Sequence, residues 1–340
     1  MFDKNNVQIP QIVELNKDVE PFIVQGTAMR SVYFNDTYKP LQFVHFSDIH
    51  AIPELWDRIV EYINYYSRYI SFGLHTGDYC GGSQNQYADF YNTGIQSERP
   101  ILNCVGNHDT VYLKNGVYKN PDDLVKSNKE NVFKLLFNKT DNWNVDFMPG
   151  DYSMTYCKDF PESNIRLIVA DFYYDFDEQK EWIKGKLEEA NKAGLHVITA
   201  SHTATDEITK KQNVTFQTLT DFKNLEDYPK MFLEDLLIDF KKAGGIHIAN
   251  LAGHYHHDKF GHTDGGILNI AVESATAWNN WCDGKRIKDT KTFDCFNVVS
   301  VDAVSHIIKL IRVGDNSDYF LRIKHTLCYD YIEDRLIYNG

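Results

Sequence analysis

The sequence predicts an α/β fold in which helices cover the outer faces of β-sheets. Short apolar segments alternate with amphipathic ones from residue 41 onwards, and this alternation is typical of βαβ units. Hydrophobic residues make up 43% of the 340-residue chain and aromatic residues 14%, which is enough for a large core. Several apolar segments end in Asp, Asn or His, so the strand ends also carry a candidate functional site.

The N-terminal half predicts a mostly parallel sheet. The segment LQFVHF at 41–46 has the continuous apolar character of a buried strand. A helix is predicted to begin at Pro53, because proline is favoured in the first helical turn. Within that helix, Leu55, Ile59 and Ile63 recur at helical spacing. The βαβαβ pattern is completed by strands at 71–78 and 100–109 and by a helix around 84–97.

A second set of strands and helices follows an interruption. Residues 111–150 are rich in Asn, Lys and Asp and are predicted to be an insertion. A hairpin then enters the second set, and a helix from 177 is predicted to end at Gly194, since glycine readily adopts the left-handed conformation after a helix. Further elements are predicted as strands at 195–202 and 246–257, a helix at 228–245 and a strand-rich C-terminal part. This order fits two sheets between outer helices.

One main domain is predicted at residues 41–315, including the insertion at 111–150. Residues 1–40 are expected to form an N-terminal extension with one edge strand, and residues 316–340 a C-terminal tail packed on the domain. The sequence contains no internal repeat and no linker that would divide the domain.

Composition and charge disfavour several classes of partner. The net charge of −13 disfavours bulk nucleic acid and anionic membranes. No signal peptide is predicted, and no apolar run approaches the roughly 20 residues of a membrane span. Six scattered cysteines without a C-x-x-C motif are typical of a reduced protein, so a cytoplasmic location is expected. No obligate protein partner is inferred.

Polar residues follow five of the predicted strands. Ligands of open α/β sheets bind at the carboxyl ends of the strands, so segments distant in sequence can bring these residues to one place. They are Asp48 and His50 in FSDIH, Asp78 in HTGD, Asn107, His108 and Asp109 in GNHD, His202 in ASH, and His254 and His256 in GHYH.

Seven of these residues suit metal binding. Four histidines, two aspartates and one asparagine, without a thiolate, favour a first-row ion such as Mn, Fe, Zn or Co over Mg or Ca. Seven ligands are too many for one ion and about right for two, and one aspartate must then bridge the ions. An isolated histidine such as His202 is more often a core residue than a ligand, so the prediction depends on the five segments together.

The order of the five segments resembles the calcineurin-like metallophosphoesterase superfamily. Its signature is D-x-H, G-D, G-N-H-[DE], a lone His and G-H-x-H, and all five blocks occur in this order over residues 48–256. The resemblance implies a four-layer αββα sandwich, in which two mixed sheets are flanked by helices. It also implies two divalent transition-metal ions, with Mn, Fe or Zn favoured.

The resemblance assigns a role to each residue. The first metal ion would bind Asp48, His50, Asp78 and His256, with Asp78 bridging the two ions. The second ion would bind Asn107, His202 and His254 as well. His108 would not be a ligand but would face the scissile phosphate, as a transition-state stabiliser or general acid. Asp109 would hold the imidazole of His108.

The predicted function is hydrolysis of phosphoric esters by in-line attack of a metal-bridging hydroxide, without a covalent enzyme intermediate. Two divalent ions, two aspartates and one hydroxide leave the site with a charge of about +1, which attracts phosphate. No Arg or Lys lies inside the five blocks to bind a terminal dianion, and this favours phosphodiesters. The expected substrate is small and phosphorylated, with nucleotide-derived diesters as one candidate.

Four alternatives stay open. A phosphomonoesterase would use the same ligands, and so would a hydrolase of non-phosphate esters. A nuclease would need a basic stripe, which this chain lacks. A non-catalytic binding module would be expected to have lost ligands or His108.

Trp278 and Trp281 could form a wall for a flat substrate group, although loop packing is the simpler interpretation.

Overall fold

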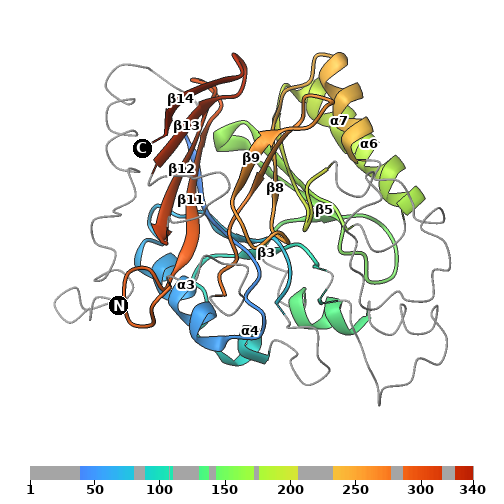
Figure 1. The fold of residues 1–340 in the computed structure, drawn as a ribbon. Helices are drawn as coiled ribbons and strands as arrows, with labels where there is room; N and C mark the ends of the chain where they lie inside the picture. Colours follow the sequence, from blue (N-terminus) through green and yellow to red (C-terminus); the bar gives the residue numbers. More distant parts are fainter. Residues whose placement is uncertain are drawn as a thin grey trace.

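Two seven-stranded β-sheets lie face to face, with helices on their outer sides (Figure 1). The computed structural model describes residues 39–79, 89–106, 108–109, 130–137, 143–171, 176–205, 233–276, 286–315 and 326–339. Within these ranges, the predicted α/β sandwich with two mixed sheets and flanking helices is confirmed.

The first sheet is parallel on one side and antiparallel on the other. Its strand order is β14-β13-β12-β11-β1-β2-β3. Strands β1, β2 and β3 run parallel, and the strands from β11 to β14 form an antiparallel series that joins β1. The strands are β1 Leu41–Phe46, β2 Phe72–His75, β3 Ile101–Asn103, β11 Cys295–Asp302, β12 Ile307–Gly314, β13 Thr326–Asp330 and β14 Arg335–Asn339.

The second sheet has the order β4-β5-β6-β7-β8-β10-β9. Strands β6, β7, β8 and β10 run parallel to one another, whereas the pairs β4–β5, β5–β6 and β9–β10 are antiparallel. The strands are β4 Asp146–Phe147, β5 Tyr156–Phe160, β6 Ile165–Val169, β7 His196–Ala200, β8 His247–Ala252, β9 Lys259–His262 and β10 Leu268–Ala271.

Helices shield the outer faces of both sheets. Helix α3 (Pro53–Tyr65) begins with proline and buries Leu55, Trp56 and Ile59, as its helical spacing predicts. On the other side, α6 (Phe176–Ala193) and α7 (Leu233–Lys242) contact each other and cover β6, β7 and β8 (Figure 1). Gly194 follows α6 with φ of 68°, which confirms the predicted glycine stop. The short helix α4 spans Asp89–Thr93.

The main core lies between the two sheets and under α3. Strand β1 is buried along its whole length because β2 and β11 flank it on either side. Phe43 lies opposite Phe72 in the register of β1 and β2, and their rings stack with centroids 4.6 Å apart. This packing holds the end of β1 rigidly, and the end of β1 is where the candidate site begins.

The C-terminal residues belong to the first sheet. Where the sequence predicts a tail from 316, the described residues 326–339 form β13 and β14 at the sheet edge. The predicted edge strand before residue 39, residues 110–129 of the insertion, and Trp278 with Trp281 lie outside the described residues. In the part of the chain that the structure describes, no helix has both the length and the apolarity needed to cross a membrane.

Candidate metal centre

The expected metal ligands meet where the parallel strands of both sheets end. Asp48 and Asp78 follow β1 and β2 of the first sheet, while His202 and His254 follow β7 and β8 of the second. The backbone N–H of His254 donates to Oδ2 of Asp48 at 3.0 Å, which ties the two sheets together at this point. The fold therefore brings residues from distant parts of the sequence to one edge of the sandwich.

The first cluster contains Asp48, His50, Asp78 and His256, whose potential ligand atoms all lie within 4.8 Å of one another. The Nε2 atoms of His50 and His256 are 2.9 Å apart. Nε2 of His256 lies 3.3 Å from Oδ1 of Asp48, and Nε2 of His50 lies 3.7 Å from the same oxygen. These four residues are the ones expected at the first metal ion.

The second cluster contains Asp78, His202 and His254, within the same 4.8 Å limit. Nε2 of His202 lies 3.3 Å from Oδ2 of Asp78 and 3.2 Å from Nδ1 of His254. Oδ2 of Asp78 is also 4.0 Å from Nε2 of His50 in the first cluster. Asp78 therefore stands between the two clusters, where the expected bridging ligand should be.

The tautomer of His202 fits metal binding. Its Nδ1 lies 2.7 Å from the carbonyl oxygen of Thr76, and because a carbonyl only accepts, this nitrogen carries the proton. Nε2 then directs a lone pair at the second cluster, as in metal-bound histidines whose other nitrogen bonds a backbone carbonyl. In the first cluster, Oδ1 of Asp48 is buried and has no hydrogen bond among the described residues. Both observations fit a pair of divalent ions.

Charges within the centre are strongly coupled. Burial would raise the pKa of Asp48, but the imidazoles of His256 and His50 hold it well below its ordinary value. Burial would lower the pKa of His202, but the Asp78 carboxylate raises it to about 9. The carboxylates thus stay ionised and attract positive charge, and a divalent ion bound there would replace the histidine proton.

The backbone of the expected ligands is strained. Asp48, His50, Asp78, His254 and His256 all have φ between 49° and 71°, in the left-handed region that residues other than glycine seldom adopt. Such strain costs roughly 1–3 kcal/mol per residue and gathers at functional sites. The surrounding contacts must therefore hold these loops in place.

Two glycines allow the loops to approach one another. A Cβ on Gly106 would overlap Oδ1 and the backbone N of Asp78, and a Cβ on Gly253 would overlap Oγ of Ser47 and lie 2.7 Å from Oδ2 of Asp48. The glycines of G-N-H-D and G-H-x-H are thus steric requirements. Sequence reasoning recognised them as parts of the blocks but missed this reason.

His108 lies beside the clusters rather than within them. Its backbone N–H donates to Oδ1 of Asp78 at 2.8 Å, and its Nε2 is 4.0 Å from Oδ2 of the same residue. The His108 ring meets the His50 ring edge-on, with centroids 5.0 Å apart. The His108 side chain is 29% exposed, whereas that of His202 is fully buried. This position leaves His108 open to a bound substrate.

Asp109 bonds the backbone of two loops at the centre. Its Oδ2 accepts the backbone N–H groups of Asp78 and Gly106, both at 2.9 Å. These two bonds tie the loop after β2 to the loop after β3. The Nδ1 atom of His108 is buried and has no hydrogen bond among the described residues, and a hold of Asp109 on this imidazole stays a prediction. Asn107 lies outside the described residues.

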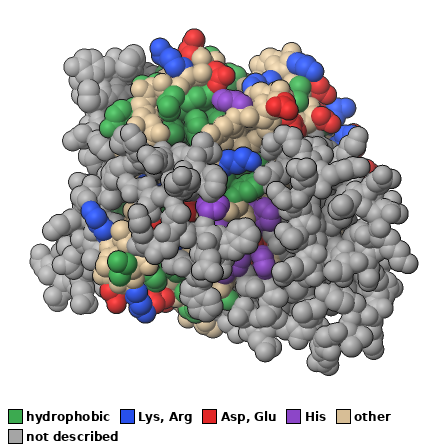
Figure 2. All heavy atoms as spheres, viewed as in Figure 1, with side chains coloured by type: hydrophobic (Ala, Val, Ile, Leu, Met, Phe, Trp, Pro, Cys, Tyr) green, Lys and Arg blue, Asp and Glu red, His purple; other side chains and the backbone are tan. Residues whose placement is uncertain are grey.

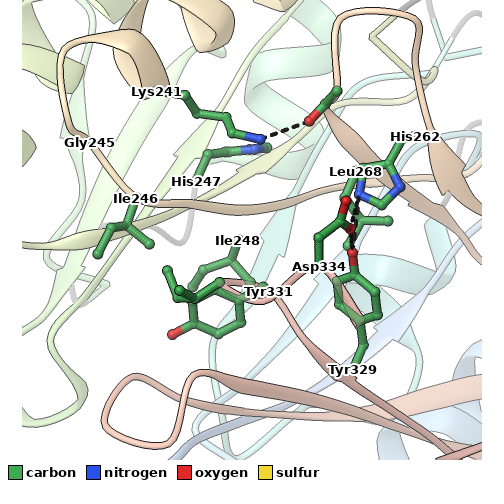
Figure 3. Close-up of a pocket in the computed structure, with 12 residues that line it drawn as sticks. Lys241, Gly245, Ile246, His247, Ile248, His262, Leu268, Tyr329, Tyr331 and Asp334 are labelled. Carbon is green, nitrogen blue, oxygen red and sulfur yellow. Dashed lines mark hydrogen bonds and ion pairs between the residues drawn. The ribbon is translucent and has the colours of Figure 1, made fainter. Parts of the chain in front are cut away.

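In the space-filling view, histidine side chains gather near the middle of the face shown (Figure 2). A separate pocket of about 170 Å³ lies elsewhere (Figure 3). It is lined by His247 at the start of β8, by His262, and by Tyr329, Tyr331 and Asp334 near the β13–β14 turn. Because the expected ligands follow the other end of β8, this pocket is distinct from the metal centre.

A sandwich of this kind, with two carboxylate–imidazole clusters that share one aspartate, is the arrangement expected of a metal-dependent phosphoesterase. Residues 41–258 match the family described as calcineurin-like phosphoesterase. The match spans well over half of the chain, and the protein belongs to this family. No curated protein sequence matches the chain.

The solved structures that resemble this chain have very different sequences. A dimetal phosphatase from Danio rerio superposes with a TM-score of 0.54 and 10% identity, covering 86% of this chain and 100% of that one. A conserved uncharacterized protein from Streptococcus pneumoniae gives a TM-score of 0.34 at 10% identity, over 86% of this chain and 98% of that one. The first of these likenesses supports the fold, and the second is too loose to add to it.

Proposed function

We propose that this protein hydrolyses small phosphodiesters at a centre of two divalent metal ions. The observation that carries the proposal is the sharing of Asp78 between the two clusters. One ion would be held by Asp48, His50, Asp78 and His256, and the other by Asp78, His202, His254 and Asn107. Imidazole-rich ligand sets favour Mn, Fe or Zn.

When bound, the two ions would supply Lewis-acid charge to the phosphoryl oxygens and lower the pKa of the attacking water. Water attacks phosphorus in line, and the bond from phosphorus to the leaving oxygen breaks. His108, which lies beside the clusters and is partly exposed, would stabilise the phosphoryl oxygens or protonate the leaving oxygen. Asp109 contributes by fixing the loops that carry Asp78 and His108.

The preference for diesters rests on the charges around the clusters. Within the described ranges, every ion pair of Asp48 and Asp78 is made with a histidine. No Lys or Arg of these ranges therefore reaches the two carboxylates, and a dianionic phosphate would lack the additional cation that commonly binds it. A diester carries one negative charge and needs less compensation.

A phosphomonoesterase is the second candidate, and one observation favours it. The Lys259 ammonium lies 4.6 Å from the centroid of the Tyr255 ring, and Tyr255 stands between His254 and His256 in the sequence. A cation so close to the ligand loop could bind a second phosphate charge. Replacing Lys259 by Met should then lower kcat/KM for p-nitrophenyl phosphate more than for bis-p-nitrophenyl phosphate, whereas equal effects would argue against a monoester role.

The expected surroundings of the enzyme follow from its thiols and charge. Cys104, Cys157, Cys295 and Cys328 are all free, which supports the proposal of a reducing, cytoplasmic environment. The net charge of −13 supports a small phosphorylated substrate rather than bulk nucleic acid or membrane. We propose no obligate protein partner.

The first experiment compares hydrolysis of bis-p-nitrophenyl phosphate by three samples: Mn²⁺-loaded protein, chelated protein and Mn²⁺-loaded His108→Ala. Turnover should be lost on chelation and fall by about 10²- to 10⁴-fold in the variant. Retention of two metal ions by the variant would separate loss of chemistry from loss of the site. A protein that binds two ions but turns over neither diester nor monoester would overturn the proposal.

The stereochemistry tests the proposed attack by water. A single turnover in H₂¹⁸O should place one ¹⁸O in the product phosphate ester, and a substrate with chiral phosphorus should react with inversion. Retention of configuration would indicate a covalent enzyme intermediate and contradict the mechanism.

A further inference from the structure

We propose that Arg286 is a positioning residue for the first metal cluster, acting through the loop that follows β10. This inference rests on the metal centre proposed above. The contact between loop and ligand is direct: the backbone N–H groups of Ala275 and Thr276 donate to the carbonyl oxygens of Ser47 and Asp48, at 2.9 and 3.2 Å. Oγ of Ser274 also donates to the Asp48 carbonyl, at 3.0 Å.

These bonds hold a strained residue. Asp48 has φ of 55°, so its backbone would relax if it were released. Its N–H is held by the carbonyl of Gly77 at 2.9 Å, while its carbonyl oxygen is held by the loop after β10. The direction of the Asp48 carboxylate therefore depends on where residues 274–276 lie.

Arg286 fixes that loop from the other side. Its guanidinium donates to the carbonyl oxygen of Ala275 at 2.7 Å and to that of Ser274. It also forms ion pairs with Glu273 at 3.4 Å and Asp315 at 3.8 Å. The Arg286 side chain is only 2% exposed, so it cannot itself meet a substrate and must act through the loop.

A second arginine supports the other side of the same cluster. The Arg312 side chain, 1% exposed, pairs with Asp258 and lies 3.6 Å from Oε2 of Glu273. Oδ1 of Asp258 also accepts the backbone N–H of Glu273 at 3.0 Å. Asp258 is two residues beyond His256, so the contacts of Arg312 and Glu273 with Asp258 hold the loop that carries His256.

The contacts of Arg286 and Arg312 with these loops explain why charged side chains are buried here. Apolar side chains of similar volume would often be as stable as a buried ion pair, but they could not hold backbone carbonyl oxygens in a fixed direction. Arg286 acts on the loop that bonds Asp48, and Arg312 acts on the loop that carries His256, and both ligands belong to the first cluster. In the second cluster, His202 is held by the Thr76 carbonyl oxygen, and among the described residues the only one shared with the first cluster is Asp78. Loss of Arg286 should therefore weaken one metal site more than the other.

Metal binding measures this asymmetry directly. Mn²⁺ titration by calorimetry and electron paramagnetic resonance would compare wild type with Arg286→Met, Arg286→Lys and Ser274→Ala. A His254→Ala background disables the second cluster and isolates the first. We expect Arg286→Met to weaken the first site by about 10- to 100-fold, Arg286→Lys to restore part of the loss, and Ser274→Ala to change affinity in the same direction.

The matched control is Arg166→Met. Like Arg286, Arg166 contacts both carboxylate and carbonyl oxygens: it bonds Asp159 at 2.6 and 2.8 Å and the Lys186 carbonyl oxygen. It lies near the start of β6, away from the carboxyl ends of the strands that carry the expected ligands. This variant should keep both Mn²⁺ affinities. In wild type, the spectrum should show two spin-coupled Mn²⁺ ions, and in Arg286→Met it should change to that of an isolated ion.

The inference would be overturned if Arg286→Met left the Mn²⁺ affinity of the first site unchanged. It would also be overturned if Arg286→Met and Arg166→Met lowered that affinity equally. If Arg286→Met does not fold, unchanged affinity in Ser274→Ala would overturn it instead. A wild-type protein that binds no metal would overturn the proposed function, an outcome distinct from either of these.

Discussion

The Nε2 atoms of His50 and His256 lie 2.9 Å apart although 206 residues separate them in the chain. Each ring also points this nitrogen towards Oδ1 of Asp48. Two imidazoles and a carboxylate that converge on one point form the ligand arrangement of a divalent ion. This relationship distinguishes His256 from its neighbour His257 in the loop after β8.

Replacing His256 by Ala should remove one of two bound metal ions and abolish phosphoesterase activity, because His256 belongs to the first cluster. His257, its neighbour, belongs to neither cluster and is the control. Metal content by mass spectrometry and turnover of bis-p-nitrophenyl phosphate would be measured for both. Equal losses in His257→Ala would show that the loop as a whole, rather than the ligand, is responsible.

Gly253→Ala should also disrupt the centre, although it removes no ligand. The added Cβ would overlap Oγ of Ser47 and push the Asp48 loop away from His254. We expect metal affinity to fall by at least about tenfold. Gly261→Ala in β9 is the matched control, because a Cβ there meets nothing within 4 Å. Wild-type metal affinity in Gly253→Ala would mean that the two loops can separate without cost.

The ion pair between Arg58 and Asp294 should contribute strongly to stability. Arg58 makes two bonds to the carboxylate, at 2.6 and 2.7 Å, and both side chains are at least 94% buried. Asp294→Ala would leave the guanidinium buried without its carboxylate, and this should lower the free energy of unfolding by about 3–5 kcal/mol.

Urea unfolding would measure that loss. The control is Lys288→Met, which breaks the exposed Lys288–Glu54 pair and should leave the transition midpoint unchanged because solvent screens such pairs. The double variant Arg58→Met/Asp294→Ala should recover part of the stability, since no charge is then left buried alone. A double variant no more stable than Asp294→Ala would contradict this explanation.

Stability should fall in mild acid partly because of His247. This residue is 6% exposed, and burial, with help from Lys241, lowers the pKa of His247 to about 3. The unfolded chain binds a proton on this residue near pH 6.5, whereas the folded protein does not. Stability is therefore fully present above pH 6.5 and is lost as the pH falls from there towards 3.

His247→Gln tests this explanation. The single histidine should account for about 2 kcal/mol of stability lost between pH 7 and pH 5, so the stability difference between wild type and variant should shift by that amount. Urea unfolding at the two pH values would measure it. A constant difference would show that His247 stays neutral in both states or is protonated in both.

Much of the fold could be predicted from local patterns. Apolar segments such as 41–46 and 246–257 indicated strands, and the spacing in α3 indicated its packed side. The C-terminal strands were harder to place. Residues 335–339 are mostly exposed in the structure, so they lack the alternation that would have identified β14.

The expected ligands were predictable because they follow strands in short blocks, three of which (HTGD, GNHD and GHYH) contain a glycine. The bonds of Asp109 to backbone N–H groups were not predictable, because these groups lie on two loops that are brought together only by the fold. The Arg286 and Arg312 contacts form no motif at all, since their partners lie on separate elements.

The sequence by itself therefore determined the chemistry of this protein: which side chains can bind metal, and that they follow strands which meet at one edge. The tertiary structure alone decided how those side chains are held. Left-handed ligand backbones, glycine contacts and buried arginines depend on distances between loops. Such distances are set only when the two sheets pack, because no local pattern encodes the position of one strand end relative to another.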